Sequence, residues 1–483
     1  MTIDLRPVAH IIGLLLTAFG AAMLFPAMLD LAAGDGNWRS FLLASAVTSA
    51  TGGAVAMASA NAMGRSLDVR QAYALTIGTW VTLSVFGAMP FYLGAPDLAL
   101  TDAIFESVSG ITTTGSTVIV GLDSLPPGMN LWRGMLNWIG GLGIAFVAMI
   151  FLPVMRVGGM QFFKAQGFET FGKSMPRAAD IARALLNAYA GLTLLCIGAY
   201  SMIGMTPLDA VVMGAASIAT GGFAPTDISF GKYPGAGEYL GALFMLLGAM
   251  PYLRYVQLVN GQPRALLFDR QVRAFVIWLA FAVGAVVLWR MVTSGAALEP
   301  TVRETLFNLT SVMTGTGFFS GSFTGWGPFV IFVVFILGLI GGCSGSSSGA
   351  LSVFRVLVLI EAIGRAVRRI AAPDRIMPLR YDGRTVGQDA VQGLMLYVNG
   401  YLLAIGVMSV ALTLTGVDAV SAIFAVWTSI GNIGYGYGDL LAPTGTFVAF
   451  PEAAKWLLIL TMLMGRLGLL ALFVVVLPRF WRA

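Results

Sequence analysis

Apolar stretches of about 20 residues, separated by short polar segments, dominate this chain. A stretch of that length is enough to cross a bilayer as an α-helix. Ten such stretches cover residues 9–31, 41–63, 71–94, 132–155, 182–204, 237–260, 273–293, 328–360, 392–414 and 453–478. The pattern therefore predicts an all-α polytopic membrane protein with ten spans.

The composition supports this class and argues against most others. Of the 483 residues, 11% are charged, whereas a soluble domain has about 25% charged residues. The chain has one histidine and two distant cysteines, which argues against a zinc site. It also contains no Walker motif, no dinucleotide fingerprint and no Ser/His/Asp set. We therefore expect neither an enzyme nor a nucleic-acid binder, and no organic cofactor.

Basic residues are distributed unequally between the two sides of the predicted bundle. If the N-terminus is cytoplasmic and the spans alternate, the cytoplasmic segments hold 21 of the 28 Lys and Arg. One basic group follows the fourth span and consists of Arg156, Lys164, Lys173 and Arg177. Acidic residues show the opposite bias, with 14 outside and nine inside. The positive-inside rule favours this orientation, in which both termini are cytoplasmic.

Four of the outer loops share one pattern, a short amphipathic stretch followed by a run rich in Gly and Thr. The runs are Thr112-Thr113-Thr114-Gly115, Ala219-Thr220-Gly221-Gly222, Thr314-Gly315-Thr316-Gly317 and Gly431-Asn432-Ile433-Gly434. Asp102, Asp209 and Glu304 each stand 13 residues before the closing glycine, where the fourth copy has Ser421. The sequence thus predicts an N-terminal hairpin (1–68) and four tandem helix–pore loop–helix repeats around a pseudo-fourfold pore, at 69–160, 161–262, 263–372 and 373–483.

Four such loops around one axis would aim a ring of carbonyl oxygens at one point. Irregular backbone at membrane depth is tolerated only where it is buried or lines water. A carbonyl ring can replace the hydration shell of a monovalent cation, and glycine permits the positive φ angles that turn carbonyls inward. The negative dipole end of each half-helix also favours a cation. The alternative is that these glycines only pack helices together.

The fourth loop indicates which cation such a ring would bind. Ile433-Gly434-Tyr435-Gly436 has the form of the V-G-Y-G core of potassium-channel filters, and the other three copies are degenerate. We therefore expect K⁺ to bind at Thr112, Thr113, Ala219, Thr220, Thr314, Gly315, Gly431 and Asn432.

Two features are expected to lie below the ring. The eighth span is interrupted by Gly341, Gly342, Cys343, Ser344, Gly345, Ser346, Ser347, Ser348 and Gly349. Buried irregular backbone there should line the pathway and could gate it; a flexible linker is the alternative. Arg466 lies roughly 20 Å into the last span, where a charge would be a barrier to cations. It could instead pair with a carbonyl or snorkel.

These motifs, with the stretch Trp132-Arg133-Gly134-Met135-Leu136-Asn137-Trp138-Ile139-Gly140-Gly141-Leu142-Gly143, resemble the Trk/Ktr/HKT superfamily of potassium transporters. The chain looks most like the bacterial TrkH/TrkG pore subunits, over nearly its whole length. The resemblance implies K⁺ as the transported ion and a location in the bacterial cytoplasmic (inner) membrane. It implies an intramembrane gate at residues 341–349 and a barrier at Arg466. It also implies a homodimer and a separate cytosolic nucleotide-binding regulatory subunit of the TrkA type.

The chain departs from the family pattern in its gate region. Ser346, Ser347 and Ser348 replace part of a Gly-rich stretch, Ser352 stands where many relatives have Lys, and Gly468 stands where an acid is usual. All four closing glycines are present, which favours K⁺ over Na⁺. We expect potassium uptake in contact with membrane lipid. The alternative is a sodium-conducting or ion-coupled alternating-access carrier, which would favour two inverted repeats.

Overall fold

The computed structural model describes residues 3–63, 67–146, 178–321, 323–372, 378–382, 384–469, 474 and 477–482. The predicted all-α class is confirmed. Besides helices, the described residues contain one short strand pair, β1 (Arg380–Tyr381) with β2 (Arg384–Thr385). The basic group expected after the fourth span, at residues 156–177, lies outside the described residues.

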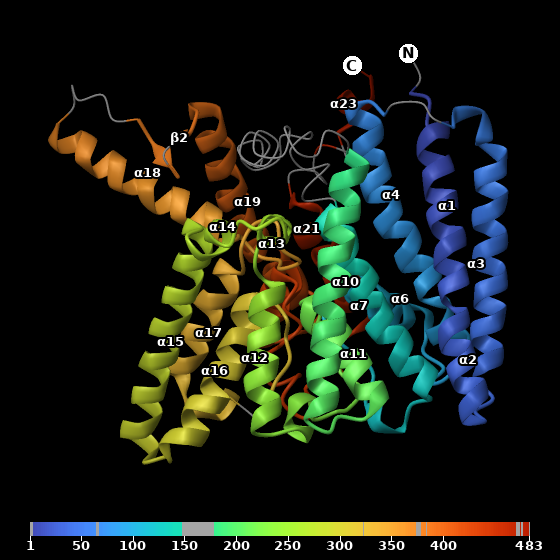
Figure 1. The fold of residues 1–483 in the computed structure, drawn as a ribbon, viewed down its shortest axis with the longest axis horizontal. Helices are drawn as coiled ribbons and strands as arrows, with labels where there is room; N and C mark the ends of the chain where they lie inside the picture. Colours follow the sequence, from blue (N-terminus) through green and yellow to red (C-terminus); the bar gives the residue numbers. More distant parts are fainter. Residues whose placement is uncertain are drawn as a thin grey trace.

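A helical hairpin at the N-terminus stands at one side of the bundle (Figure 1). It consists of α1 (Arg6–Ala22), α2 (Leu24–Ala33) and α3 (Trp38–Ala58). A Cβ on Gly13 or on Gly52 would meet the backbone of the facing helix, so these glycines allow close packing of α1 on α3. Asp30 anchors the hairpin to the rest of the chain, because its carboxylate accepts a hydrogen bond of 2.5 Å from the amide of Gly128.

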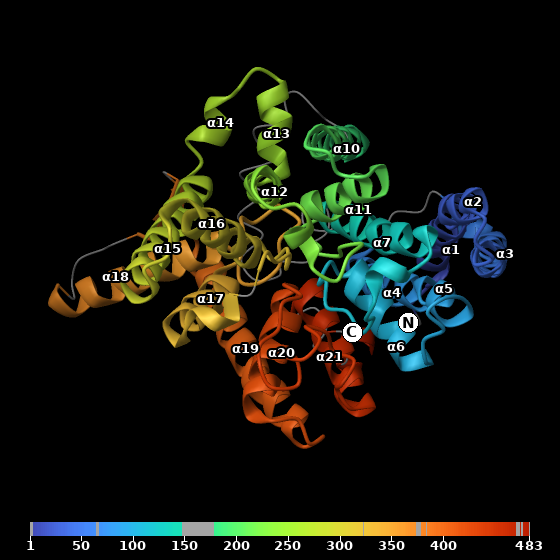
Figure 2. The ribbon, with the colours of Figure 1, turned by 90° about the horizontal axis from the view of Figure 1, so that it is seen from below.

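Four helical units follow the hairpin and surround a common centre (Figure 2). The first unit is α4 (Val69–Gly87), α5 (Met89–Leu93), α6 (Leu100–Ile111) and α7 (Pro127–Phe146). The second is α10 (Ala178–Met202), α11 (Pro207–Ile218), α12 (Ala236–Gly248), α13 (Tyr252–Val259) and α14 (Arg264–Leu267). The third is α15 (Arg270–Ser294), α16 (Leu298–Thr314), α17 (Pro328–Ile340) and α18 (Val353–Ala371). The fourth is α19 (Gln388–Thr413), α20 (Ala419–Gly431), α21 (Glu452–Leu467) and α23 (Pro478–Arg482).

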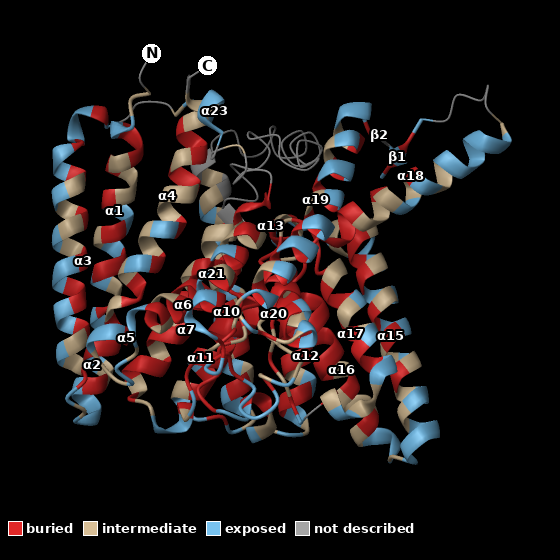
Figure 3. Ribbon diagram, turned by 180° about the vertical axis from the view of Figure 1, so that it is seen from behind, coloured by how far each residue is buried: buried red, intermediate tan, exposed pale blue. Residues whose placement is uncertain are grey.

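The half-helices α6, α11, α16 and α20 form the buried centre of the molecule, and the long helices form its perimeter (Figure 3). On α15, Phe275, Leu279 and Val286 are buried, while Ile277 and Phe281 are exposed. Exposed apolar side chains on a long apolar helix are suited to contact with lipid. The fold therefore has a protein-packed interior and an apolar outer surface.

Not all of the ten predicted spans are single continuous helices. Among the described residues, six helices are long and apolar enough to cross a membrane, or seven if one bent pair counts as a span. The bent pair is α12 with α13, which meet at an angle of 92°. Pro251 lies at this break, and proline both lacks an amide donor and clashes with the preceding helical turn. The predicted span 237–260 is therefore two helices.

Two further predicted spans are also interrupted. The span 328–360 divides into α17 and α18, as the serine-rich run led us to expect. In the span 453–478, helix α21 ends at Leu467, one residue after Arg466, and Gly468 follows with a φ of 82°. A positive φ of this kind stops a helix at little cost only at glycine. Arg466 consequently lies in the last turn of α21, where the helix dipole favours a cation.

Candidate functional site

Each half-helix ends directly at its Gly/Thr run, here named loop 1 (residues 112–115), loop 2 (219–222), loop 3 (314–317) and loop 4 (431–434). In every loop the second residue has a positive φ: Thr113 (53°), Thr220 (49°), Gly315 (73°) and Asn432 (50°). Its amide donates to a carbonyl three residues earlier, and the next amide donates to a carbonyl five residues earlier at 2.8–2.9 Å. This pair of bonds is a Schellman turn, which ends all four half-helices in the same way.

The closing glycine of every loop also has a positive φ: Gly115 (84°), Gly222 (71°), Gly317 (81°) and Gly434 (91°). Positive φ angles therefore alternate along each loop, at its second and fourth residues. This alternation can turn successive carbonyl oxygens to one side of the chain, as in a cation-binding filter. The four sequence runs thus share one backbone conformation as well as one register.

The four loops meet in a closed ring. A Cβ on Gly115 would meet the Gly221 carbonyl oxygen of loop 2. A Cβ on Gly222 would likewise meet loop 3, one on Gly317 would meet loop 4, and one on Gly434 would meet loop 1. Because each glycine touches the backbone of the next loop, any larger side chain would push two loops apart. The structure thus brings together all sixteen residues predicted for the four loops.

A cavity of about 660 Å³ lies on the glycine side of the ring. Its lining includes all four closing glycines and, from loop 4 onward, Tyr435, Tyr437 and Asp439. The three acids that stand 13 residues before a closing glycine are paired with basic side chains at 2.7–2.9 Å, in the pairs Asp102–Lys455, Asp209–Lys232 and Glu304–Arg290. The hydrogen bond to Asp209 raises the pKa of the Lys232 ammonium.

The opposite side of the ring is covered by residues 341–349, here named the serine segment. The Thr220 hydroxyl of loop 2 donates to the Ser347 hydroxyl at 3.3 Å. Gly349 packs so closely on loop 4 that a Cβ there would meet the Gly431 carbonyl oxygen, and the serine segment also borders Gly315 of loop 3. The segment predicted as a gate thus lies directly against three of the four loops.

Arg466 supplies the contact to the remaining loop. Its Nη2 donates to the Thr113 hydroxyl of loop 1 at 2.5 Å and to the Ser347 carbonyl oxygen at 2.7 Å. Among the ion pairs of the described residues, none includes Arg466, in keeping with Gly468 in place of the family's acid. The guanidinium therefore links the ring to the serine segment while keeping its positive charge uncompensated by a carboxylate.

The break between α12 and α13 holds the serine segment from the other side, which the sequence did not reveal. The Ala249 carbonyl oxygen accepts from the Cys343 amide, and the Tyr252 amide donates to the Gly345 carbonyl oxygen, both at 3.0 Å. The Tyr252 hydroxyl donates to the Ile218 carbonyl oxygen at 2.9 Å and lies 3.1 Å from the Ser347 hydroxyl. Pro251 was the available signal, because a proline inside an apolar span marks a break.

Comparisons with known proteins agree with this architecture. Residues 39–482 match the family model of TrkH, described as a cation transport protein. The chain is 38% identical to the Trk system potassium uptake protein TrkI of Halomonas elongata, over 86% of this chain and 85% of that protein. It is 33% identical to TrkH of Escherichia coli K12, over 99% of both chains.

A solved structure has the same architecture. The crystal structure of the potassium transporter TrkH from Vibrio parahaemolyticus matches with a TM-score of 0.91 and 30% identity, covering 99% of this chain and 100% of that chain. The match extends over the hairpin and all four units. The chain therefore belongs to the TrkH family of cation transport proteins.

Proposed function

We propose that this protein takes up potassium through a selective carbonyl-lined pore, with loops 1 to 4 as its filter. The observation that carries this proposal is the closed ring of four loops with alternating positive φ angles. The names of the relatives support it, because TrkI and TrkH are potassium uptake proteins. The membrane potential would drive uptake, since it supplies about 2.3 kcal/mol per charge per 100 mV.

The filter would bind K⁺ through backbone oxygens of Thr112, Thr113, Ala219, Thr220, Thr314, Gly315, Gly431 and Asn432. These residues lie at the first two positions of each loop, on the side of the serine segment. A cation there would exchange water for carbonyl oxygens, at the negative ends of four half-helix dipoles.

The serine segment and Arg466 would form the gate, and the contacts described above correspond to its closed state. The segment covers the ring, and Arg466 adds a positive charge where a cation would leave the filter. Opening would require Arg466 to release Thr113 or the Ser347 carbonyl oxygen. The remaining hydrogen bonds to Tyr252 would then set how far the segment moves.

We also propose the cellular setting of the protein. Both termini lie at the same end of the bundle (Figure 1), which fits a multi-pass protein of the bacterial inner membrane with cytoplasmic termini. The family suggests a homodimer surrounded by lipid and a TrkA-like cytosolic subunit that binds nucleotides. The five units would be the hairpin (1–68) and the repeats at 69–160, 161–262, 263–372 and 373–483.

The test is uptake of Rb⁺ and Na⁺ into liposomes that contain the purified protein. We expect the wild type to prefer Rb⁺ and Gly115→Ser to lose that preference, because its side chain would meet the Gly221 carbonyl oxygen. Gly235→Ser is the matched control. Gly235 has nearly the same φ, 82° against 84°, but nothing lies within 4 Å of its Cβ position. Equal uptake of Rb⁺ and Na⁺ by the wild type would refute potassium selectivity and favour the sodium-conducting alternative.

A further inference from the structure

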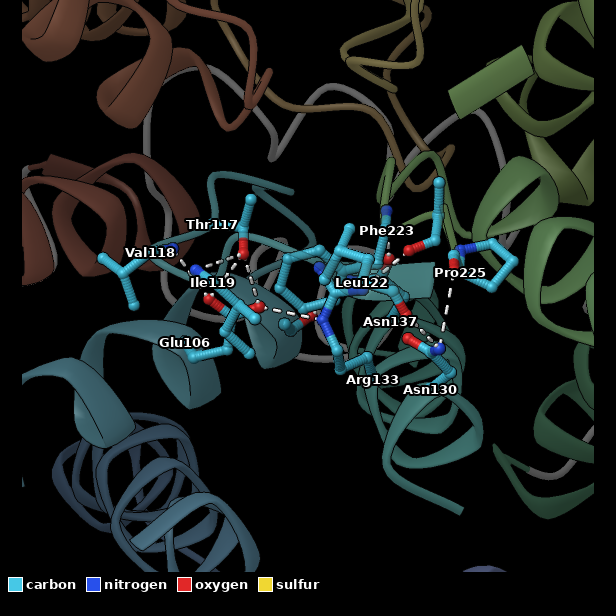
Figure 4. A network of polar contacts seen from close by, with 12 residues as sticks. Glu106, Thr117, Val118, Ile119, Leu122, Asn130, Arg133, Asn137, Phe223 and Pro225 are labelled. Atoms are coloured by element: carbon cyan, nitrogen blue, oxygen red, sulfur yellow. Dashed lines mark hydrogen bonds and ion pairs between the residues drawn. The ribbon is translucent and has the colours of Figure 1, made fainter. Parts of the chain in front are cut away.

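Three polar side chains form a stripe on α7, an otherwise mostly apolar helix. Asn130, Arg133 and Asn137 are spaced by three and four residues, so they share one face. All three are buried, and that face lies between loops 1 and 2 (Figure 4). Such a stripe is costly to bury unless every group finds a partner.

Arg133 pairs with a carboxylate behind loop 1. Its Nε donates to Glu106 of α6 at 2.9 Å, and both side chains are at most 1% exposed. Glu106 also accepts from the Thr117 hydroxyl at 2.9 Å and from the Val118 amide at 3.0 Å. The carboxylate thus holds the Thr117 side chain and the Val118 backbone, two and three residues after Gly115.

The other contacts of the stripe fix loop 2. The Arg133 Nη1 donates to the Ala224 carbonyl oxygen at 2.6 Å, and its guanidinium carbon lies 4.2 Å from the centre of the Phe223 ring. Asn137 accepts from the Phe223 amide at 3.0 Å and donates to the Gly110 carbonyl oxygen at 2.9 Å. A single face of α7 therefore holds the end of loop 2 against the half-helix that leads into loop 1.

The position that Glu106 occupies relative to the closing glycine holds a different residue in each repeat. Nine residues before the closing glycine stand Glu106, Met213, Asn308 and Ala425. Asn308 reproduces part of the Glu106 arrangement, because its Oδ1 accepts from the Ser320 amide at 3.2 Å, three residues after Gly317. Met213 and Ala425 have no side-chain donor and no oxygen or nitrogen acceptor. At this position, repeats 1 and 3 therefore have a side chain that hydrogen-bonds the residues after the loop, and repeats 2 and 4 do not. Only repeat 1 has a charged pair there, among the described residues.

We propose that Glu106 and Arg133 are positioning residues for ion selectivity. They hold loop 1 and loop 2 at the separation that brings Gly115 against the Gly221 carbonyl oxygen. This inference rests on the proposed role of the loops as a filter. The planar guanidinium divides its donors between the buried Glu106 carboxylate and the Ala224 carbonyl oxygen, so it ties the two loops together in one geometry. Losing one member leaves the other as an unpaired buried charge, so the neighbouring loops must shift to accommodate it.

The test compares Na⁺ and Rb⁺ uptake by the full-length protein in liposomes, normalised to the amount of folded protein. We expect Glu106→Gln to raise the Na⁺/Rb⁺ uptake ratio about tenfold, because a charge-assisted hydrogen bond is lost from the brace. Glu106→Asp, which keeps the charge, should retain part of the selectivity. Lys232→Gln is the control, since it also breaks an ion pair to a half-helix, but one at the outer end of α11.

A purely structural role predicts less folded Glu106→Gln protein with the wild-type ratio, and that result would overturn the proposal. If Glu106→Gln does not fold, Thr117→Val is the second test, because it keeps the Glu106–Arg133 pair and removes the hydroxyl that donates to Glu106 and accepts from the Ile119 amide. We expect it to raise the ratio about threefold, and an unchanged ratio would count against the proposal.

Gly115→Ser distinguishes failure of the positioning role from failure of the filter assignment. If it changes the ratio while Glu106→Gln and Thr117→Val do not, the filter stands and the positioning role fails. If none of them changes the ratio, the filter assignment itself fails.

Discussion

Three residues in the ring adopt a backbone conformation that their side chains disfavour. Thr113, Thr220 and Asn432 have positive φ angles, which cost roughly 1–2 kcal/mol for a threonine and less for an asparagine. Each has a specific partner: Arg466 for Thr113, Ser347 for Thr220, and the Thr114 hydroxyl, at 2.9 Å, for Asn432. Glycine would relieve the strain but lose these contacts. The strained residues therefore connect the loops to their surroundings.

Arg466 provides a direct test at the residue scale. Arg466→Ala removes two hydrogen bonds that join loop 1 to the serine segment and removes the positive charge below the ring. We expect Rb⁺ uptake into liposomes to increase about tenfold, because hydrogen bonds to a charged group resist opening more than neutral ones. Arg479→Ala, at an exposed position of α23, should leave uptake unchanged. Equal uptake by wild type and Arg466→Ala would contradict the barrier role.

At the scale of elements, two broken helices complete each other's hydrogen bonds. The break between α12 and α13 frees the Ala249 carbonyl oxygen and the Tyr252 amide, and the serine segment between α17 and α18 partners both. Buried backbone groups need such partners. The two breaks are therefore one structural feature, and movement of the serine segment must break or replace these bonds.

The Tyr252 hydroxyl tests this coupling. Tyr252→Phe removes the contacts to the Ile218 carbonyl oxygen and the Ser347 hydroxyl. We expect Rb⁺ uptake to rise about fivefold, the effect of one buried hydrogen bond of about 1 kcal/mol that favours the closed state. Tyr255→Phe is the matched control, because that hydroxyl donates at 2.7 Å to the Leu247 carbonyl oxygen and, among the described residues, makes no hydrogen bond to the serine segment. A similar increase in both variants would mean that general loosening is responsible.

At the scale of the whole molecule, the ring closes because the first and last repeats meet. Lys455 of α21 pairs with Asp102 of α6 at 2.7 Å, and the Phe447 amide donates to the Thr117 carbonyl oxygen at 2.8 Å. These contacts join residues more than 300 positions apart in the sequence. Residues from both ends of the chain are therefore needed to complete the site.

The sequence predicted the features that repeat and missed those that depend on how repeats meet. The registered Gly/Thr runs identified the four loops, because each copy needs the same local backbone conformation. Arg133 stands at the beginning of the predicted span 132–155, yet it is buried, since its partners Glu106 and Ala224 lie on other elements. The bend at Pro251 was missed because the apolar pattern continues across it. Motifs within one segment could be predicted from the sequence, whereas contacts between segments far apart in the chain could not.

The most direct test of the central claim is a crystal structure of the protein grown in Rb⁺, with an anomalous difference map. We predict an anomalous peak on the axis of the ring, surrounded by backbone oxygens of loops 1 to 4, between the glycine-lined cavity and the serine segment. The peak should be absent from crystals of Gly115→Ser. A transport-competent protein that shows no Rb⁺ within the ring, or that binds Rb⁺ only elsewhere, would contradict the account.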